Sequence, residues 1–337
     1  MWRTLPQYRD ERIALMSPKS NLLVTGGAGF IGSHLVERLL ADGHSVTVID
    51  DLSTGRLENL SAVLSHPDFV MVKAKISQCD RLGELVKKSS GIYHLAAAVG
   101  VELVMAFGLR TIETNLRETQ LVLDEASLRR TPILLASTSE VYGKSRQEAF
   151  SEEDDLLIGP PHLSRWGYAC SKLMDEFLAL AHAKEHGTPV VVARLFNTVG
   201  PRQTGQYGMV LPRFIQAAQR GQLLKVFGDG RQSRCFCYVG DTVEALVRLQ
   251  GCGAARGEVF NVGNPEEISI GKLAEKVIAR LHSSSMIEYV PYETAYGAGF
   301  QDMLRRKPVI EKLSRYVGFR PATRLDDIID KTVAYWK

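Results

Sequence analysis

Residues 21–32 read N-L-L-V-T-G-G-A-G-F-I-G and join an apolar run to a glycine-rich turn. The run is short and apolar, which predicts a buried strand over 21–25. Beyond the glycines, residues 33–42 space their apolar side chains as an amphipathic helix does. A strand, a glycine turn and a helix in this order predict the first unit of a doubly wound α/β sheet.

Each glycine of this turn has a separate steric role. Gly26 permits the tight turn, Gly29 lets the backbone approach a pyrophosphate, and Gly32 lets helix and strand pack closely. Phe30 and Ile31 stand where the helix opens, and the free N–H groups and positive dipole end of a helix favour phosphate there. The turn therefore predicts a dinucleotide site.

An acidic residue follows at the expected distance. Asp50 ends the next predicted strand, about 20 residues beyond the glycines, where a carboxylate binds the adenosine ribose hydroxyls. That carboxylate repels a 2′-phosphate, and Asp51 strengthens the repulsion. We therefore predict NAD as the cofactor. Arg56 lies close enough in the sequence to keep NADP as the alternative.

The first two-thirds of the chain alternates strand and helix patterns. The strand patterns lie at 45–50, 69–76, 91–96, 132–137 and 189–195, and helical patterns lie at 111–126 and 168–186. Such alternation predicts a Rossmann-type, doubly wound parallel sheet with helices on both faces. After residue 195, shorter elements and loops predict a smaller C-terminal mixed α/β lobe.

The same patterns suggest domain boundaries. We expect an N-terminal extension over 1–20, a dinucleotide-binding domain over 21–195 to which 235–262 returns, and a smaller lobe formed by 196–234 and 263–337. The extension lacks the apolar core of a secretory signal, and Met16 is an alternative start.

The composition is that of an ordinary globular protein of 337 residues, 45% hydrophobic, with a formal net charge of +3. No basic block points to nucleic acid as a partner, and no window approaches the roughly 18 to 20 apolar residues of a membrane span. Five scattered cysteines are typical of a reduced, cytoplasmic protein. Cys235 and Cys237 are too close together for a zinc ribbon, so we expect no metal.

Two residues of a helical pattern carry acid–base chemistry. Tyr168 and Lys172 stand four apart and therefore share one helix face. A tyrosine normally titrates at about 10, but a nearby ammonium and an oxidised nicotinamide stabilise the phenolate. The spacing alone is common. After a dinucleotide pattern, it makes Tyr168 a candidate general base for a substrate hydroxyl.

The segment 136–143 reads A-S-T-S-E-V-Y-G and follows a predicted buried strand. Ligands of open α/β sheets bind at this edge. Thr138 is a candidate to hydrogen-bond the hydroxyl being oxidised, and Glu140 directs a carboxylate at the same crevice. Ser139 is a further candidate. The alternative for Glu140 is an acid that only starts a helix or solvates a loop.

Four motifs together resemble the extended short-chain dehydrogenase/reductases that act on nucleotide sugars: T-G-G-A-G-F-I-G, S-T-S-E-V-Y-G, Y-x-x-x-K and R-L-F-N-T-V-G-P-R. The resemblance covers nearly all of 21–337. It implies that Tyr168 takes the proton of the sugar C4 hydroxyl while tightly held NAD accepts the hydride. Thr138 would support the proton transfer, and Lys172 would orient the nicotinamide ribose. Epimerases, dehydratases and decarboxylases then diverge from one 4-ketone.

Within that family the chain is most similar to UDP-glucuronate decarboxylases. Dehydratases usually carry Asp-Glu after the threonine, whereas Ser139 and Glu140 stand here, and a serine does not readily protonate a leaving hydroxyl. Further similar stretches lie at 165–172, 232–236, 257–267 and 295–308. We expect decarboxylation of UDP-glucuronate, with a 4-epimerase of a UDP-sugar or UDP-uronic acid as the alternative. A 4,6-dehydratase is disfavoured.

The resemblance also implies substrate contacts. Arg306 would lie in the sugar pocket, where its cation would hold the sugar carboxylate, or instead contact the diphosphate or solvent. Asn197 and Arg234 would contact the diphosphate, for which an arginine fork is suited. Phe227 would pack on the base, although an ordinary core role fits it equally. These residues would place the nucleotide-sugar site in the smaller lobe.

Some positions depart from the family pattern. Ile76 keeps its place in the cofactor site, but Lys75 replaces an aspartate that contacts adenine. The loop near Val99–Glu102 also differs from the usual substrate loop. Because Glu102 would be unfavourable near a substrate carboxylate, a neutral sugar remains an alternative substrate. The resemblance further implies a homodimer through helices near 111–126 and 173–183. A non-catalytic NAD-binding scaffold is disfavoured, because the threonine, tyrosine and lysine are all present.

Overall fold

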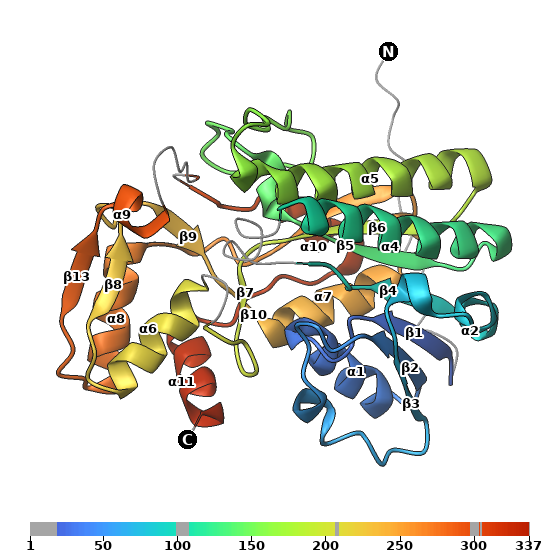
Figure 1. Cartoon of the computed structure of the whole chain (residues 1–337), viewed down its shortest axis with the longest axis horizontal. Helices are drawn as coiled ribbons and strands as arrows, with labels where there is room; N and C mark the ends of the chain where they lie inside the picture. Colours follow the sequence, from blue (N-terminus) through green and yellow to red (C-terminus); the bar gives the residue numbers. More distant parts are fainter. Residues whose placement is uncertain (1–18, 99–107, 206–208, 297–302, 304, 337) are drawn as a thin grey trace.

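A seven-stranded parallel sheet forms the centre of the molecule, in the order β11–β6–β5–β4–β1–β2–β3 (Figure 1). The computed structural model describes residues 19–98, 108–205, 209–296, 303 and 305–336. Apart from residues 19 and 20, the expected N-terminal extension lies outside the described residues, as does the loop at 99–102.

The sheet reverses its winding direction between β1 and β4. Its strands are β1 (Asn21–Thr25), β2 (Ser45–Asp50), β3 (Phe69–Lys73), β4 (Gly91–His94), β5 (Ile133–Thr138), β6 (Val190–Leu195) and β11 (Glu258–Val262). β2 and β3 lie on one side of β1, and the later strands lie on the other. Connections that leave in opposite directions open a crevice at the carboxyl ends of the strands, where ligands of such sheets bind.

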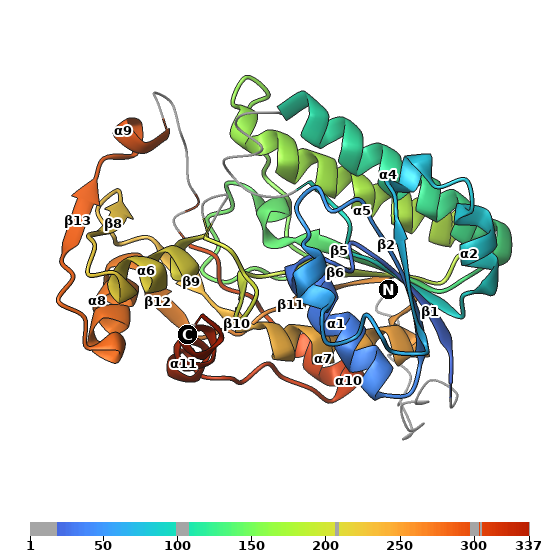
Figure 2. The same cartoon turned by 60° about the horizontal axis from the view of Figure 1, so that its bottom comes forward.

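A smaller lobe follows β6 and gathers at one end of the molecule (Figure 2). Its helices are α6 (Val210–Gln219), α8 (Ile270–Leu281), α9 (Tyr292–Tyr296) and α11 (Leu325–Tyr335). Its strand pairs are β8 (Leu224–Phe227) with β13 (Ile287–Val290), β9 (Ser233–Cys235) with β12 (Glu267–Ser269), and β7 (Thr198–Val199) with β10 (Cys237–Tyr238). The lobe has its own apolar core, which includes Phe214, Leu273 and Ile328.

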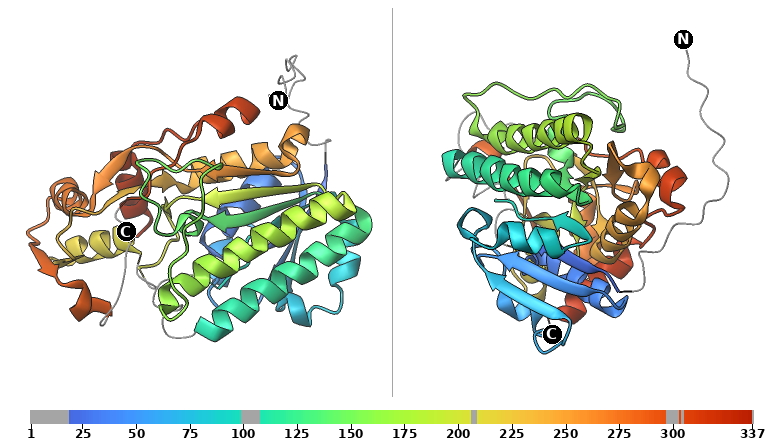
Figure 3. Two further views of the ribbon diagram at one scale, coloured as in Figure 1. Left: turned by 90° about the horizontal axis from the view of Figure 1, so that it is seen from above. Right: turned by 90° about the vertical axis from the view of Figure 1, so that its right-hand side faces the viewer.

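Helices cover both faces of the central sheet (Figure 3). One face carries α1 (Phe30–Ala41), α7 (Val239–Gly251) and α10 (Glu311–Val317), and the other carries α2 (Leu82–Lys88), α4 (Gly108–Arg129) and α5 (Gly167–His186). This arrangement confirms the predicted Rossmann-type sheet with a smaller mixed lobe. Within the described ranges, no helix combines the length and the apolar character needed to cross a bilayer.

Some predicted boundaries shift by a few residues. The third strand ends at Lys73, because the chain turns into a short 3-10 helix at Ile76–Gln78. The first helix begins at Phe30, three residues before its apolar periodicity starts, because extended Gly29 is its N-cap. The helix therefore opens directly at the glycine turn.

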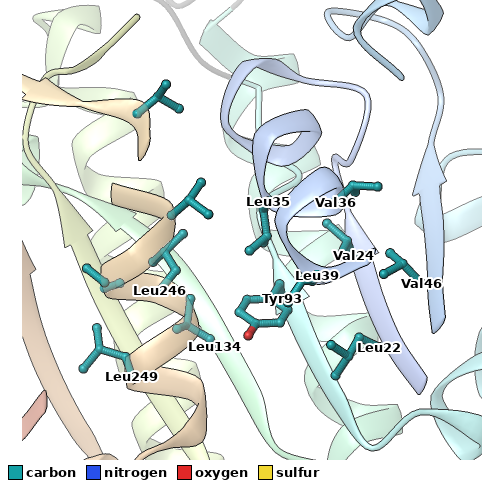
Figure 4. Packing of buried hydrophobic residues seen from close by; sticks show 14 of the residues in the cluster. Leu22, Val24, Leu35, Val36, Leu39, Val46, Tyr93, Leu134, Leu246 and Leu249 are labelled. Atoms are coloured by element: carbon teal, nitrogen blue, oxygen red, sulfur yellow. The ribbon is translucent and has the colours of Figure 1, made fainter. Parts of the chain in front are cut away.

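The larger core cluster joins α1 and α7 through the sheet. Leu35 and Leu39 of α1, Leu246 and Leu249 of α7, and the strand residue Leu134 are each fully buried (Figure 4). Because one continuous cluster includes both helices and the strands, a cavity here weakens the packing that holds the glycine turn.

We expect Leu246→Ala to lower the free energy of unfolding by about 2–5 kcal/mol, since the fully buried side chain leaves a cavity. Denaturant unfolding followed by circular dichroism measures the change. Leu223→Ala is the control: that side chain is 47% exposed, so its effect is expected to stay within about 0.5 kcal/mol. Equal effects for the two variants would contradict the packing described.

Candidate active site

The glycine turn between β1 and α1 leaves no room for larger side chains. Gly26 has a φ of +72°, and a Cβ there would lie 2.8 Å from the backbone nitrogen of Ala96. A Cβ on Gly32 would collide with the carbonyl oxygen of Gly26. Gly29 is the N-cap of α1, so the helix N–H groups open onto the turn. This bare cradle at a helix start fits the diphosphate of a dinucleotide.

Asp50 braces the same turn from the end of β2. Its carboxylate accepts hydrogen bonds from Ala28 N at 2.9 Å and from Leu52 N at 2.8 Å, and the residue is 8% exposed. Burial raises the pKa of Asp50, while the two backbone donors oppose that shift. The sequence predicted a ribose contact, and the structure adds a supporting role that the spacing did not reveal.

The other predicted cofactor residues surround this turn. Phe30 and Ile31 lie in the first turn of α1, partly buried against the larger core cluster. Ile76 is buried after β3, next to the core on the opposite face of the sheet. Lys75 beside it is exposed. The structure thus has a buried apolar side chain at Ile76, and the residue before it is a lysine rather than an acid.

The strand β5 delivers the second group of predicted residues. Thr138 ends the strand, and its hydroxyl oxygen accepts a hydrogen bond from Glu140 N at 3.2 Å. This contact starts the 3-10 turn Ser139–Tyr142. The Ser139 hydroxyl is buried and has no hydrogen-bond partner among the described residues. An unpartnered buried hydroxyl at a strand end is suited to a ligand atom.

Tyr168 and Lys172 come from the first turns of α5. The Tyr168 side chain is hydrogen-bonded to Thr138, so the structure brings the predicted tyrosine and threonine together. Burial raises the pKa of Tyr168 above its usual range, and Glu140 and Asp175 raise it further. The bond to Thr138 and the charge of Arg165 oppose this rise. Further positive charge is therefore needed to make the phenol a base.

Glu140 is buried among guanidinium groups. It forms ion pairs with Arg165 and, at 3.4 Å, with Arg306, and the charge of Arg234 acts on it as well. Burial by itself raises the pKa of Glu140, but the arginines outweigh burial and lower the pKa to about 2. Glu140 is therefore an anion at neutral pH.

A second buried network fixes the turn that carries Glu140. The Tyr142 hydroxyl donates to Asn261 Oδ1 at 2.7 Å and accepts from Arg194 at 3.0 Å. Arg194 in turn pairs with Glu176 of α5. Asn261 donates to the carbonyl oxygen of Phe150 at 2.9 Å. These bonds tie β5, β6, β11 and α5 together beneath the site.

The predicted diphosphate residues lie on the lobe side. Asn197 follows β6, and its amide donates to Cys235 O at 2.9 Å. Arg234 is 6% exposed on β9 and lies close enough to act electrostatically on Glu140. Phe227 ends β8 and stacks under the Arg213 guanidinium at 4.5 Å. The structure thus brings Arg234 to the Glu140 cluster, whereas the described contacts of Phe227 lie within the lobe.

Two residues of the site escaped the sequence reasoning. Arg165 stands three residues before Tyr168, and Asp175 stands three residues after Lys172. The three-residue spacing places Asp175 on the same face of α5 as Lys172, whereas Arg165 lies in the 3-10 turn before α5 and pairs with Glu140. Spacing does not reveal the burial of either residue. Only the structure shows that Arg165 is 4% exposed and that Asp175 is fully buried.

A glycine turn at a sheet crevice, with a tyrosine, a lysine and a threonine nearby, defines a dinucleotide-dependent oxidoreductase site. Consistent with this class, the chain matches the model of the NAD dependent epimerase/dehydratase family over residues 22–263. The chain belongs to that family and is an NAD-dependent enzyme.

Known proteins with related sequences and structures include decarboxylases and epimerases. The chain is 39% identical over 320 residues to UDP-N-acetyl-alpha-D-glucosaminuronate decarboxylase of Bacillus cytotoxicus, covering 95% of this chain and 98% of that protein. It is 35% identical to UDP-glucuronic acid decarboxylase 1 of Xenopus tropicalis, covering 98% and 75%. A solved UDP-glucuronic acid 4-epimerase of Bacillus cereus, with UDP-glucuronic acid and NAD, has a TM-score of 0.83 at 28% identity, covering 94% and 98%.

We expect Gly26→Ala to weaken NAD+ binding at least tenfold, because the new methyl group meets Ala96 and because a left-handed residue costs about 1–2 kcal/mol. Titration calorimetry on the nucleotide-free protein measures the affinity. Gly43→Ala is the control, since Gly43 has a φ of +86° but open space around it. If both variants lost affinity equally, the collision would not be the cause.

Proposed function

We propose that this chain decarboxylates a UDP-linked uronic acid, with UDP-glucuronate as the leading substrate, through a transient 4-ketone of the sugar. The observation that carries the proposal is the pairing of Arg306 with Glu140 beside Tyr168. An arginine side chain that is only 12% exposed and lies beside Glu140 offers a sugar carboxylate a charged hydrogen-bond donor. The decarboxylases at 35% and 39% identity support the same reaction.

In this mechanism Tyr168 takes the proton of the C4 hydroxyl while Thr138 holds the hydroxyl in place. NAD+, when bound, would supply the hydride acceptor for C4. The Lys172 ammonium binds the nicotinamide ribose, and its charge favours the phenolate of Tyr168. Asp50 binds the adenosine ribose, and the cradle of Gly26, Gly29 and Gly32 takes the diphosphate.

The 4-ketone makes the neighbouring carboxylate that of a β-keto acid. When the bond between C5 and C6 breaks, carbon dioxide leaves and its electron pair passes to the C4 oxygen as an enolate. C5 then takes up one proton. Arg306 orients the departing carboxylate, and because Glu140 already shares that guanidinium, the carboxylate is not held too tightly to leave.

The anionic state of Glu140 also separates the possible reactions. A 4,6-dehydratase needs a protonated acid to release the C6 hydroxyl, but Glu140 has a pKa of about 2 and Ser139 is a hydroxyl. A 4-epimerase must rotate the ketone within the site. The buried Arg306 beside Glu140 favours a fixed carboxylate over a rotating sugar.

A second substrate has its own support. The relative that is 39% identical carries a name that specifies UDP-N-acetyl-alpha-D-glucosaminuronate. The chemistry at C4, C5 and C6 is the same for that sugar, and the two substrates differ only at C2. The acetamido sugar is therefore the second candidate for the same site.

The proposal assigns NAD and the nucleotide sugar to different parts of the chain. Residues 21–195 with 235–262 would bind NAD, and 196–234 with 263–337 would bind the nucleotide sugar. Asn197 and Arg234 would hold the diphosphate, which their places beside Cys235 and Glu140 support. Phe227 would contact the base, and Ile76 would pack against the adenine.

A homodimer and a cytoplasmic location also belong to the proposal. The helices α4 and α5 pack against each other on one face of the sheet. Their outer surface exposes apolar side chains, with Met174 at 48%, Phe177 at 63% and Leu109 at 73% exposure. Such a surface suits a second copy of the same helix pair. All five cysteines are free, as in a reducing compartment.

The decisive experiment incubates the protein with NAD+ and a panel of UDP-sugars and reads product masses. We expect loss of carbon dioxide from UDP-glucuronate or its 2-acetamido analogue and no change in neutral UDP-sugars. Tyr168→Phe should lower kcat by about 10²–10⁴-fold, because no general base remains, whereas Tyr335→Phe, at a 49% exposed residue, should not. Mass-neutral conversion of the uronate would establish the epimerase instead.

We expect Arg306→Gln to lower kcat/KM for the uronate by about 10–100-fold, since a charge-assisted hydrogen bond contributes about 1.5–3 kcal/mol. Affinity for UDP-xylose, which lacks the carboxylate, should change much less. Steady-state kinetics and calorimetry measure the two effects. The neighbouring Arg305→Gln is the control, because that side chain is 46% exposed and pairs with Glu267. Equal losses for both sugars would exclude a carboxylate contact.

A further inference from the structure

A line of buried hydrogen bonds connects the glycine turn to Lys172. The Thr25 hydroxyl, at the end of β1, lies 2.8 Å from His94 Nδ1. His94 Nε2 lies 3.1 Å from the Thr119 hydroxyl of α4. The Thr119 side chain also lies close enough to Asp175 of α5 to lower the pKa of that carboxyl, and Asp175 accepts a hydrogen bond from Lys172 Nζ at 2.8 Å. These residues thus connect β1, β4, α4 and α5.

The direction of each bond follows from the donors. Burial, with the charge of Lys172, lowers the pKa of His94 to about 3, so the imidazole is neutral. Thr25 accepts from Ala96 N at 3.3 Å and gives its proton to Nδ1 of His94. We therefore assign the remaining ring proton to Nε2, which donates to Thr119. The Thr119 hydroxyl, which accepts from His94, has its own proton available toward the neighbouring Asp175 carboxylate.

Asp175 is the counterion of Lys172. Their side chains are 0% and 2% exposed, and they lie three residues apart on one face of α5. A lysine ammonium has three protons. One is committed to Asp175, which fixes the direction of the other two. A buried carboxylate therefore decides where the ammonium can bind a ribose hydroxyl.

We propose that Asp175 is a positioning residue that holds the Lys172 ammonium at the nicotinamide ribose and, by its negative charge, sets the pH at which Tyr168 acts as a base. This inference rests on the proposed function of Tyr168 and Lys172. It adds a positioning residue that acts through its ion pair with Lys172 and through its charge near Tyr168.

The charges around Tyr168 determine the sign of the effect. The groups that face Tyr168 and Lys172 are Glu140 of the turn after β5, Arg165 before α5, Asp175 on α5 and neutral His94 on β4. Arg306 and Arg234 lie beyond Glu140. Glu140 and Asp175 raise the pKa of Tyr168, and Arg165 lowers it. Glu140 has the larger effect on Tyr168 and Asp175 the next. Asp175 is the one of the two that lies outside the guanidinium cluster of Glu140, so its removal changes the charge near the base without changing that cluster.

The base must be ionised to take the C4 proton, so activity rises with pH through the pKa of Tyr168. Asp175→Asn removes the charge but keeps an oxygen that accepts from Lys172. The acid limb of the kcat/KM profile should move about one unit toward lower pH, the size expected for one nearby charge. NAD+ affinity by calorimetry should stay within about threefold, since one charge-assisted hydrogen bond is only weakened.

Asp175→Ser removes both the charge and the reach to Lys172. Its acid limb should move in the same direction, and its NAD+ affinity should fall about tenfold or more, since a charge-assisted contact is lost. The serine is smaller than aspartate, so this variant also serves if the asparagine variant fails to fold. Asp124→Asn on α4, where the aspartate is 53% exposed, is the matched control and should leave both readouts unchanged.

Folded variants with the wild-type acid limb and the wild-type NAD+ affinity would overturn the role of Asp175. An equal drop in kcat at every pH, with no shift of the limb, would show a purely structural residue and would also overturn it. If the wild-type protein converts no uronate, the proposed function fails. The NAD+ affinity of Asp175→Ser then still decides whether the carboxylate positions Lys172.

Discussion

The close approach between the turn after β1 and the start of α1 is the contact on which the rest of the site depends. A side chain at Gly32 would collide with the backbone of Gly26. The bare backbone lets the helix begin at once, which directs its N–H groups into the crevice. Asp50 then fixes the turn through Ala28 and Leu52. The cofactor site is thus built from backbone shape and one buried carboxylate.

Around this contact the fold buries an unusual amount of charge. Glu140 with Arg165, Lys172 with Asp175, and Glu176 with Arg194 are ion pairs whose side chains are at most 12% exposed. Buried pairs add little net stability, but removing one partner costs about 3–5 kcal/mol. Their value here is orientation, because each pair fixes the position of a charged group at or beside the candidate site.

The two anions of the site have different duties. Glu140 lies between arginines, which lower its pKa and largely neutralise its charge; in the proposed function this cluster binds the sugar carboxylate. Asp175 is paired with Lys172 and raises the pKa of Tyr168 by its charge. A site that oxidises and then decarboxylates needs both functions. In the proposed reaction, Tyr168 must ionise to act as the base. The substrate carboxylate must be bound, but not so tightly that carbon dioxide cannot leave.

The sequence by itself determined the fold class, the family and the cofactor. The fold class and the cofactor follow from the glycine turn and Asp50, which are read from spacing along the chain, and the family follows from the resemblance of four motifs to the extended short-chain dehydrogenase/reductases. It also predicted Arg306 as a substrate residue, a role that stays a prediction. It did not predict the partners Arg165, His94, Thr119 and Asp175.

Only the tertiary structure decided these partners. Arg306 and Glu140 are 166 residues apart in the chain, and His94 meets Thr119 across β4 and α4. Whether a polar side chain is a solvated surface group or a buried counterion depends on what packs over it. That packing follows from the crossover connections of the sheet, which bring distant elements together, and no local spacing contains this information.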